Sequence, residues 1–257
     1  IRDVLGSRGL GDVYKRQSQF GTFEAIVIPV LFFPSTILCA LSGILITEAA
    51  RATAANNQAH LQRLTKAVIQ KTLQLSIFIA AGLLLYGNLI GTLLDGGALA
   101  GHLIRLLAPV VPFIYLEIVL EALLKGMGQQ SFSSLNYLAE YTIRIAIVLV
   151  CIPKFGFYGI VLSYYASNVC GNCFRLWKTC KTARIRFSFW SDVGFPLFAA
   201  ALAFQVPLCG LRLLHGMQFV WICLLPAILI DYALLKSYGK ITAIPLLSKK
   251  QHVCSSA

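Results

Sequence analysis

Four charged residues within apolar sequence are the first candidates for chemistry. Glu117 and Glu121 are four residues apart, as are Glu140 and Arg144, so each pair shares one face of a helix. Glu117 and Glu140 each lie nine residues from the intervening loop at 126–131, which is about 13–14 Å along each helix at ~1.5 Å per residue. We therefore expect neighbouring antiparallel helices to bring Glu117, Glu140 and Arg144 into one cluster.

Two roles for this cluster are open. In the first, the Arg144 guanidinium contacts a pyrophosphate or an acidic sugar, and Glu117, Glu121 and Glu140 take part in proton or ion coupling. In the second, the charges form a structural ion pair that locks two helices. An unpaired arginine near the middle of a bilayer costs at least ~2.5–3.5 kcal/mol. Arg144 should therefore be paired or face water.

The composition predicts that lipid surrounds much of the chain. The sequence has 257 residues, of which 58% are hydrophobic and 12% are charged, and its mean hydropathy is +0.75. A soluble domain is about 45–50% apolar and about 25% charged. Half the usual charge does not cover a soluble surface, so we expect an all-α polytopic transmembrane bundle, with backbone polar groups satisfied within each helix.

About seven segments are long enough to cross a bilayer, which takes about 20 apolar residues. Glu140 and Arg144 interrupt the fourth of them. The seven segments are 25–46, 73–94, 103–124, 135–152, 157–176, 193–213 and 218–235.

An amphipathic stretch precedes the second segment. Leu61, Leu64 and Val68 recur at helical spacing, and basic and amide residues occupy the other positions. Such a pattern is typical of a helix that lies along, or feeds into, the inner leaflet. A cytoplasmic extension of the second span explains it equally well.

Lysine and arginine in the loops predict the orientation, because cytoplasmic loops are enriched in them. One set of loops holds fourteen of these residues and the opposite set holds three. The fourteen are Arg51, Arg63, Lys66, Lys71, Lys125, Arg175, Lys178, Lys181, Arg184, Arg186, Lys236, Lys240, Lys249 and Lys250, and the three are Arg105, Lys154 and Arg212. We expect a cytoplasmic C-terminus. The net charge of +12 then reflects topology and contact with anionic headgroups, and nucleic-acid binding is not expected.

Two prolines, Pro29 and Pro34, interrupt the first segment. Transporters use such broken helices at binding sites and hinges, although proline is also common in membrane helices generally. Pro29 and Pro34 are therefore hinge candidates.

No catalytic or metal-binding pattern accompanies these residues. The four histidines lie at loops or ends, and Cys170 and Cys173 form a single CxxC on a membrane segment without a second pair, whereas zinc takes four ligands with paired spacing. We expect neither an enzyme nor a metal or other cofactor.

The first residues differ from all that follow. The stretch "SRGLGDVYKRQ" is polar and glycine-rich, and it is similar to a translated DNA-library adaptor; a genuine polar tail is the alternative. We expect residues 1–17 to be a non-native leader, 18–240 a transmembrane helical lobe and 241–257 a cytoplasmic tail.

Several motifs resemble the polysaccharide biosynthesis and stage V sporulation protein B family, within the multidrug/oligosaccharidyl-lipid/polysaccharide exporter superfamily. "FEAIVIPVLFFPSTILCALSGILITEAARATAANNQ" resembles a family segment with two prolines, a Leu-Ser pair and an acidic-alanine motif. "YLEIVLEALLKGMGQQ" resembles the family's LxGxGQ loop, and "IRIAIVLVCIPKFGFYGIVLSYYASNV" resembles a later pair of spans. Thr47 and Ala49 stand where members often have Pro and Ser.

The resemblance implies a function and a missing part. Family members are two-lobe transporters of fourteen spans, so the seven segments would be the C-terminal half, partnered by a missing N-terminal lobe. The implied function is a bacterial plasma-membrane flippase or exporter of lipid-linked polysaccharide or peptidoglycan precursors by alternating access. The implied partners are the lipid bilayer and a lipid-linked oligosaccharide or similar anionic amphiphile. A multidrug/cation antiporter of the same superfamily and a non-transporting membrane scaffold or assembly protein are the alternatives.

Overall fold

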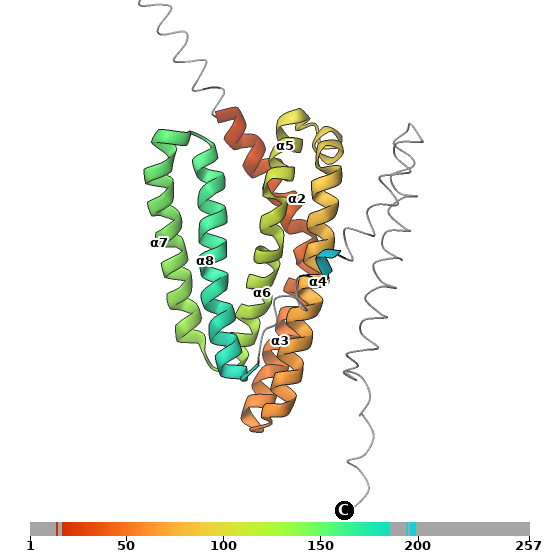
Figure 1. Ribbon diagram of the computed structural model, residues 1–257, viewed down its shortest axis with the longest axis vertical. Helices are drawn as coiled ribbons and strands as arrows, with labels where there is room; N and C mark the ends of the chain where they lie inside the picture. The colour runs from red at the N-terminus through yellow and green to blue at the C-terminus, as the bar shows by residue number, and fades with distance from the viewer. Residues whose placement is uncertain (1–13, 15–16, 186–193, 195, 199–257) are drawn as a thin grey trace, which may run out of the picture.

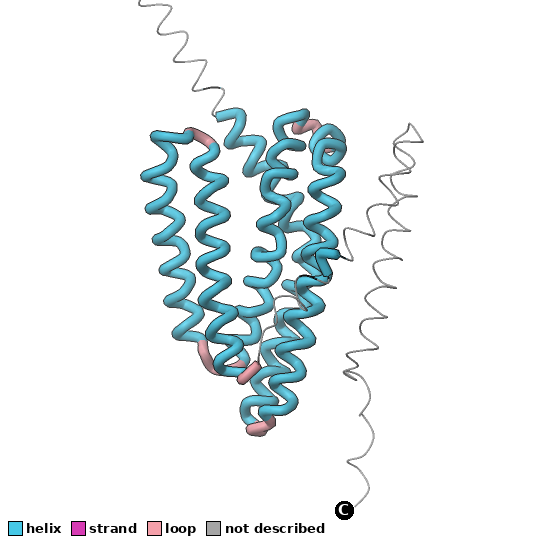
Figure 2. Tube along the Cα trace, in the orientation of Figure 1, coloured by secondary structure: helices cyan, strands magenta, loops and turns pink. Residues whose placement is uncertain are grey.

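The computed structural model describes residues 14, 17–185, 194 and 196–198. Within these residues the chain is built from helices and contains no strand. Figures 1 and 2 show long helices that run up and down beside one another. The expected all-α class is confirmed for this part of the chain. The predicted span at 218–235 and the tail at 241–257 lie outside it, as do nearly all of the span at 193–213 and of the leader at 1–17.

The first long helix runs from Gln17 to Ala54 and contains two irregular turns. A π-helical turn, η1 (Phe23–Val27), leads into the short helix α2 (Ile28–Phe32). A 3₁₀ turn, η2 (Phe33–Ser35), then leads into α3 (Thr36–Ala54). The predicted span at 25–46 is therefore one irregular helix.

The two irregular turns lie beside the proline hinge candidates. Pro29 is at the start of α2, and Pro34 lies within η2. A proline has no N–H to bond the carbonyl four residues before it, and its ring clashes with that carbonyl. Local π and 3₁₀ adjustments restore the backbone bonding in membrane helices. The prolines thus account for the irregular turns, and hinge motion at Pro29 and Pro34 stays a prediction.

The second long helix, α4 (Gln58–Leu93), is continuous over 36 residues. Asn57 caps its start, because the Asn57 Oδ1 accepts from the His60 N–H. At ~1.5 Å per residue α4 is about 54 Å long, well beyond the ~30 Å hydrocarbon layer. The amphipathic stretch before residue 73 is therefore continuous with the second predicted span, and its place relative to the inner leaflet stays a prediction.

Three further long helical segments complete the described bundle. The third consists of α5 (Gly97–Leu107), the 3₁₀ turn η3 (Ala108–Val110) and α6 (Val111–Gly126). The last two are α7 (Gln130–Phe155) and α8 (Tyr158–Ala183), which pack against each other along a tight antiparallel hairpin. Gly156 lies in the turn between them with φ +58°, a backbone conformation that glycine adopts without steric cost.

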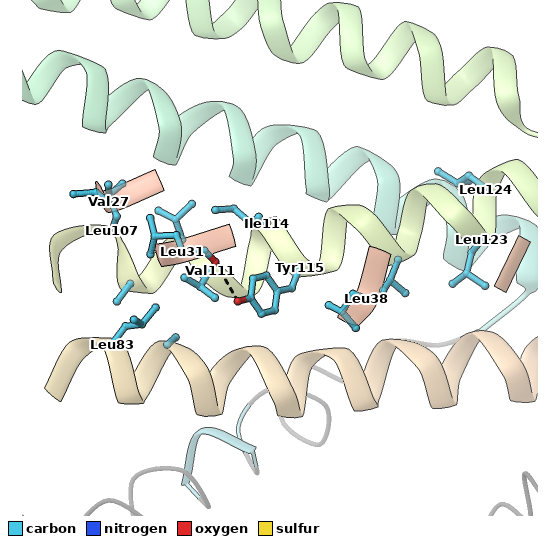
Figure 3. Packing of buried hydrophobic residues seen from close by; sticks show 14 of the residues in the cluster. Val27, Leu31, Leu38, Leu83, Leu107, Val111, Ile114, Tyr115, Leu123 and Leu124 are labelled. Carbon is cyan, nitrogen blue, oxygen red and sulfur yellow. Dashed lines mark hydrogen bonds between the residues drawn. The ribbon is translucent and has the colours of Figure 1, made fainter. Parts of the chain in front are cut away.

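The apolar core lies between the first helix, α4, α5 and α6. Leu31, Leu107, Val111 and Leu123 are at most 1% exposed within it, and Figure 3 shows them spread along the interface between the helices. By contrast, α7 contacts mainly α8, and α8 in turn rests on α6. The hairpin of α7 and α8 is therefore an outer layer on a compact apolar unit (Figure 1).

Two tyrosine hydroxyls join helices at the 3₁₀ turns. Tyr115 on α6 donates to the Leu31 carbonyl at 3.1 Å (Figure 3), and Tyr165 on α8 donates to the Leu106 carbonyl at 2.5 Å. Each accepting carbonyl lies three residues before a proline, in the sequences LFFP and LLAP. In each case a tyrosine hydroxyl from a neighbouring helix donates to a backbone carbonyl at a turn where proline removes a backbone N–H donor.

The two ends of the bundle carry different turns (Figure 1). At one end Gln58 on α4 donates to the Thr182 carbonyl near the end of α8. At the other end the rings of Phe23 and Phe157 pack edge to face, with centroids 5.7 Å apart. The first end holds the α3–α4 and α6–α7 turns, and the second holds the α4–α5 and α7–α8 turns.

Four described helical segments are long and apolar enough to cross a membrane: Gln17–Ala54, Gln58–Leu93, Gly97–Gly126 and Gln130–Phe155. They contain the first four predicted spans. The fifth predicted span, 157–176, is also helical, but α8 is not among the four. The described residues therefore support a membrane protein with four candidate spans.

Candidate functional site: a charged interior between three helices

The α7 helix has apolar residues outside and polar residues inside. Its buried residues are Ser133, Asn136 and Glu140, which lie on one face. Its exposed residues include Leu138 and Leu149, at 69% and 70%. This pattern is the reverse of a soluble helix and suits a helix with lipid outside and a polar interior.

The buried face of α8 is polar in the same way. Leu162, Phe174 and Trp177 are exposed on its outer side. Apart from the adjacent Ser167 and Asn168, its buried polar residues recur at intervals of three and four, which places them on one helix face. They are Ser163, Ser167, Asn168, Asn172, Arg175 and Thr179; we call this set the polar face of α8.

Arg175 is the centre of a buried ion network. Its Nη2 lies 3.1 Å from Glu117 Oε1 on α6, and its Nη1 lies 2.9 Å from Glu140 Oε2 on α7. The Arg175 side chain is 0% exposed, and the Glu140 side chain is 3% exposed. One guanidinium therefore joins three helices.

Gly171 makes the space for this network. A Cβ at this position would overlap the Glu140 carboxylate and come within 3.1 Å of Arg175 Nη1. The Gly171 carbonyl also accepts from Asn136 Nδ2 at 3.2 Å. The absent side chain lets α7 approach α8 closely enough for Glu140 to reach Arg175.

Arg144 is a looser member of the network. Its Nη2 lies 3.5 Å from Glu140 Oε1, and its Nε donates to Ser167 Oγ at 3.0 Å. Its guanidinium also lies over the Tyr164 ring, 4.6 Å from the centroid, where a cation–π attraction operates. The Arg144 side chain is 22% exposed, so it remains partly accessible.

Glu121 belongs to a separate pair. Its Oε1 lies 2.6 Å from Lys125 Nζ, one turn along α6. The Tyr137 side chain interacts with both Glu117 and Glu121 and so connects this pair to the network. Glu121 is near the other carboxylates but has its own cation.

The structure changes the predicted cluster in one respect. Glu117, Glu140 and Arg144 do belong to one network, as expected, but Arg175 provides the ion pair to Glu117. The assignment of Arg175 to a loop is wrong, because Arg175 is buried within α8, which continues past it to Ala183. The helical spacing of the polar residues of α8 is visible in the sequence, and it could have indicated that Arg175 lies on a buried helix face.

The network is electrically balanced and deep. Glu117 and Glu140 offset Arg144 and Arg175, and Glu121 offsets Lys125. At ~1.5 Å per residue, Arg144 lies about 21 Å from the start of α7, near the middle of a ~30 Å hydrocarbon layer that α7 would cross. Every charge of the network therefore has a partner at a depth where an unpaired charge is costly.

Among the described residues, no group of three or more His, Cys, Asp or Glu side chains is arranged to hold a metal ion.

Comparisons with protein-family models, with curated proteins and with solved structures give no match for this chain.

Proposed function

We propose that this chain is a helical lobe of a membrane transporter that moves a lipid-linked polysaccharide or peptidoglycan precursor across a bacterial plasma membrane by alternating access. The observation that carries the proposal is the charged network of Glu117, Arg175, Glu140 and Arg144 within helices of membrane length. Ionisable residues inside membrane helices are rare and are the first candidates for substrate or ion pathways.

The difference between the two arginines supports an anionic substrate. Arg175 is fully buried and contacts two carboxylates. Arg144 is partly exposed, and its one carboxylate is also shared with Arg175. A guanidinium that is incompletely neutralised attracts a phosphate and can bind it through two parallel hydrogen bonds. Arg144 is thus the member of the network that suits a pyrophosphate group.

The same pairing disfavours a cation antiporter. Each of Glu117, Glu121 and Glu140 already lies within 3.5 Å of an arginine or lysine nitrogen. A cationic drug would have to displace one of these partners. A scaffold without transport activity remains the second candidate, because a balanced network also serves to lock α6, α7 and α8 together.

The test uses the protein with both lobes, reconstituted in liposomes with a fluorescent polyprenyl-pyrophosphate saccharide. Arg144→Lys keeps the charge beside Glu140 but loses the planar fork. We expect this variant to unfold at nearly the wild-type temperature and to flip the lipid about tenfold more slowly, which corresponds to ~1.4 kcal/mol.

Arg63→Lys is the matched control, because Arg63 is exposed at the start of α4. It should flip the lipid at the wild-type rate. A stable Arg144→Lys variant with full flipping activity would rule out the phosphate contact. A wild-type protein that flips no lipid would leave the scaffold as the remaining candidate.

A further inference from the structure

Buried polar atoms without hydrogen-bond partners occur on both α7 and α8. On α8 they are Asn172 Oδ1, Thr179 Oγ1 and the three guanidinium nitrogens of Arg175. On α7 they are Ser133 Oγ and Glu140 Oε2. The contacts of Arg175 with its carboxylates are close enough for ion pairs, but their geometry does not make hydrogen bonds.

The register of α7 against α8 shows where these residues lie along the hairpin. Asn136 on α7 bonds to Gly171 on α8, and Lys178 lies over the Phe132 ring. In this antiparallel register, Ser133 and Thr179 lie between the ion network and the open end of the hairpin, where α7 begins and α8 ends.

Buried polar groups in folded proteins are nearly always hydrogen-bonded, and an ordered water supplies the partner where no protein group does. The unpartnered set contains donors, such as Arg175, and acceptors, such as Asn172 Oδ1. Water is both a donor and an acceptor, so it satisfies both kinds. A site of this polarity fits water much better than it fits lipid tails.

We propose that a file of water molecules lies between α7 and α8, and that it connects the Glu140–Arg175 pair with the end of the bundle that holds the α6–α7 turn. Thr179 lies four residues from the end of α8, which is about 6 Å at ~1.5 Å per residue. A few water molecules are enough to bridge this distance.

On the far side of Glu140, the Arg144 Nε bonds to Ser167 Oγ, and the Arg144 guanidinium lies over the Tyr164 ring. The Arg144 side chain is partly exposed, so the water file is proposed only for the stretch between the Glu140–Arg175 pair and the α6–α7 turn. This inference goes beyond the proposed function, because hydration of the face does not depend on what the protein carries.

Thiol labelling in membranes tests the proposal with the protein that carries both lobes. The native cysteines are first replaced by serine or alanine, and single cysteines are then placed at Ser133, Thr179 and Asn172. The reagent is 2-aminoethyl methanethiosulfonate, which reacts with the thiolate, a form that a dry apolar site disfavours. The matched control is Leu120→Cys on α6, which is 0% exposed in an apolar cluster.

We expect the cysteines at Ser133 and Thr179 to react about tenfold faster than the one at Leu120, because only they meet water and form the thiolate. Ser133→Cys replaces one oxygen by sulfur, so it tests the face with the least change to folding. Equal, slow labelling of Ser133→Cys and Leu120→Cys would show that the interface is dry and would overturn the proposal. The readout is independent of transport, so it stands apart from the outcome of the flipping assay.

Discussion

At the level of single residues, Arg175 and Arg144 hold the same carboxylate with different strength. Arg175 also binds Glu117 and is fully buried, whereas Arg144 contacts Glu140 alone among the carboxylates at 3.5 Å. Removing one partner of a buried pair leaves an uncompensated charge, which costs more than the pair itself contributes. The two arginines should therefore differ in how much the fold depends on them.

Arg175→Met should lower the stability of the protein by about 3–5 kcal/mol, because it leaves the Glu117 and Glu140 carboxylates buried without their shared cation. Arg144→Met is the matched control and should cost less, since Arg175 still neutralises Glu140. The measurement is the apparent unfolding temperature in detergent. Adding Glu117→Gln to Arg175→Met should recover part of the loss. Equal effects of the two arginine changes would contradict the central place of Arg175.

At the level of the helices, prolines and tyrosines act together. Pro34 and Pro109 lie in 3₁₀ turns, and a tyrosine from a neighbouring helix donates to the carbonyl three residues before each of them. Within the lipid, no water is present to donate a hydrogen bond to an unsatisfied backbone carbonyl. Each tyrosine thus stabilises an irregular turn and also fixes it to the next helix.

Tyr115→Phe should destabilise the protein by about 1–3 kcal/mol, because it removes the buried donor to the Leu31 carbonyl and changes nothing else in shape. Tyr158→Phe is the control, since Tyr158 is 55% exposed. The measurement is the unfolding temperature of each variant in detergent. If Pro34 works as a hinge, Tyr115→Phe should also change the transport rate; a lower unfolding temperature with an unchanged rate would mean that the bend is purely architectural. A Tyr115→Phe variant as stable as Tyr158→Phe would mean that the hydroxyl contributes nothing.

At the level of the whole molecule, most cations of the described bundle lie toward one of its two ends. Arg51, Lys125 and Arg184 lie near the end with the α3–α4 and α6–α7 turns, whereas Lys154 lies at the other end beside the α7–α8 turn. Cytoplasmic loops are rich in lysine and arginine. We therefore expect the end with the α3–α4 turn to face the cytoplasm.

Labelling of single cysteines in intact cells measures this orientation in a cysteine-free background. A membrane-impermeant maleimide should label Lys154→Cys from outside and should label Ala55→Cys only after the cells are opened. Both positions are exposed, so a difference in labelling reports the side of the membrane. Labelling of Ala55→Cys in intact cells would reverse the predicted orientation.

Much of the architecture follows from the sequence alone. The first four predicted spans lie within four long apolar helices, because hydropathy and length largely decide whether a segment forms a membrane helix. The i,i+4 spacing of Glu140 and Arg144 also placed these two residues on one face, and they form an ion pair. Such statements hold because they depend only on the geometry of a single helix.

The pairing between helices was decided by the tertiary structure. Arg175 lies at the end of the predicted span 157–176 and was counted with the adjacent loop cations, whereas α8 continues to Ala183. Which cation meets Glu117 depends on which third helix packs beside α6 and α7, and on the space that Gly171 leaves for Glu140. Likewise, the prolines are visible in the sequence, but the tyrosines that stabilise their turns lie 84 and 59 residues from the carbonyls they reach. A contact over that separation is set by packing, since no local pattern encodes the position of a neighbouring helix.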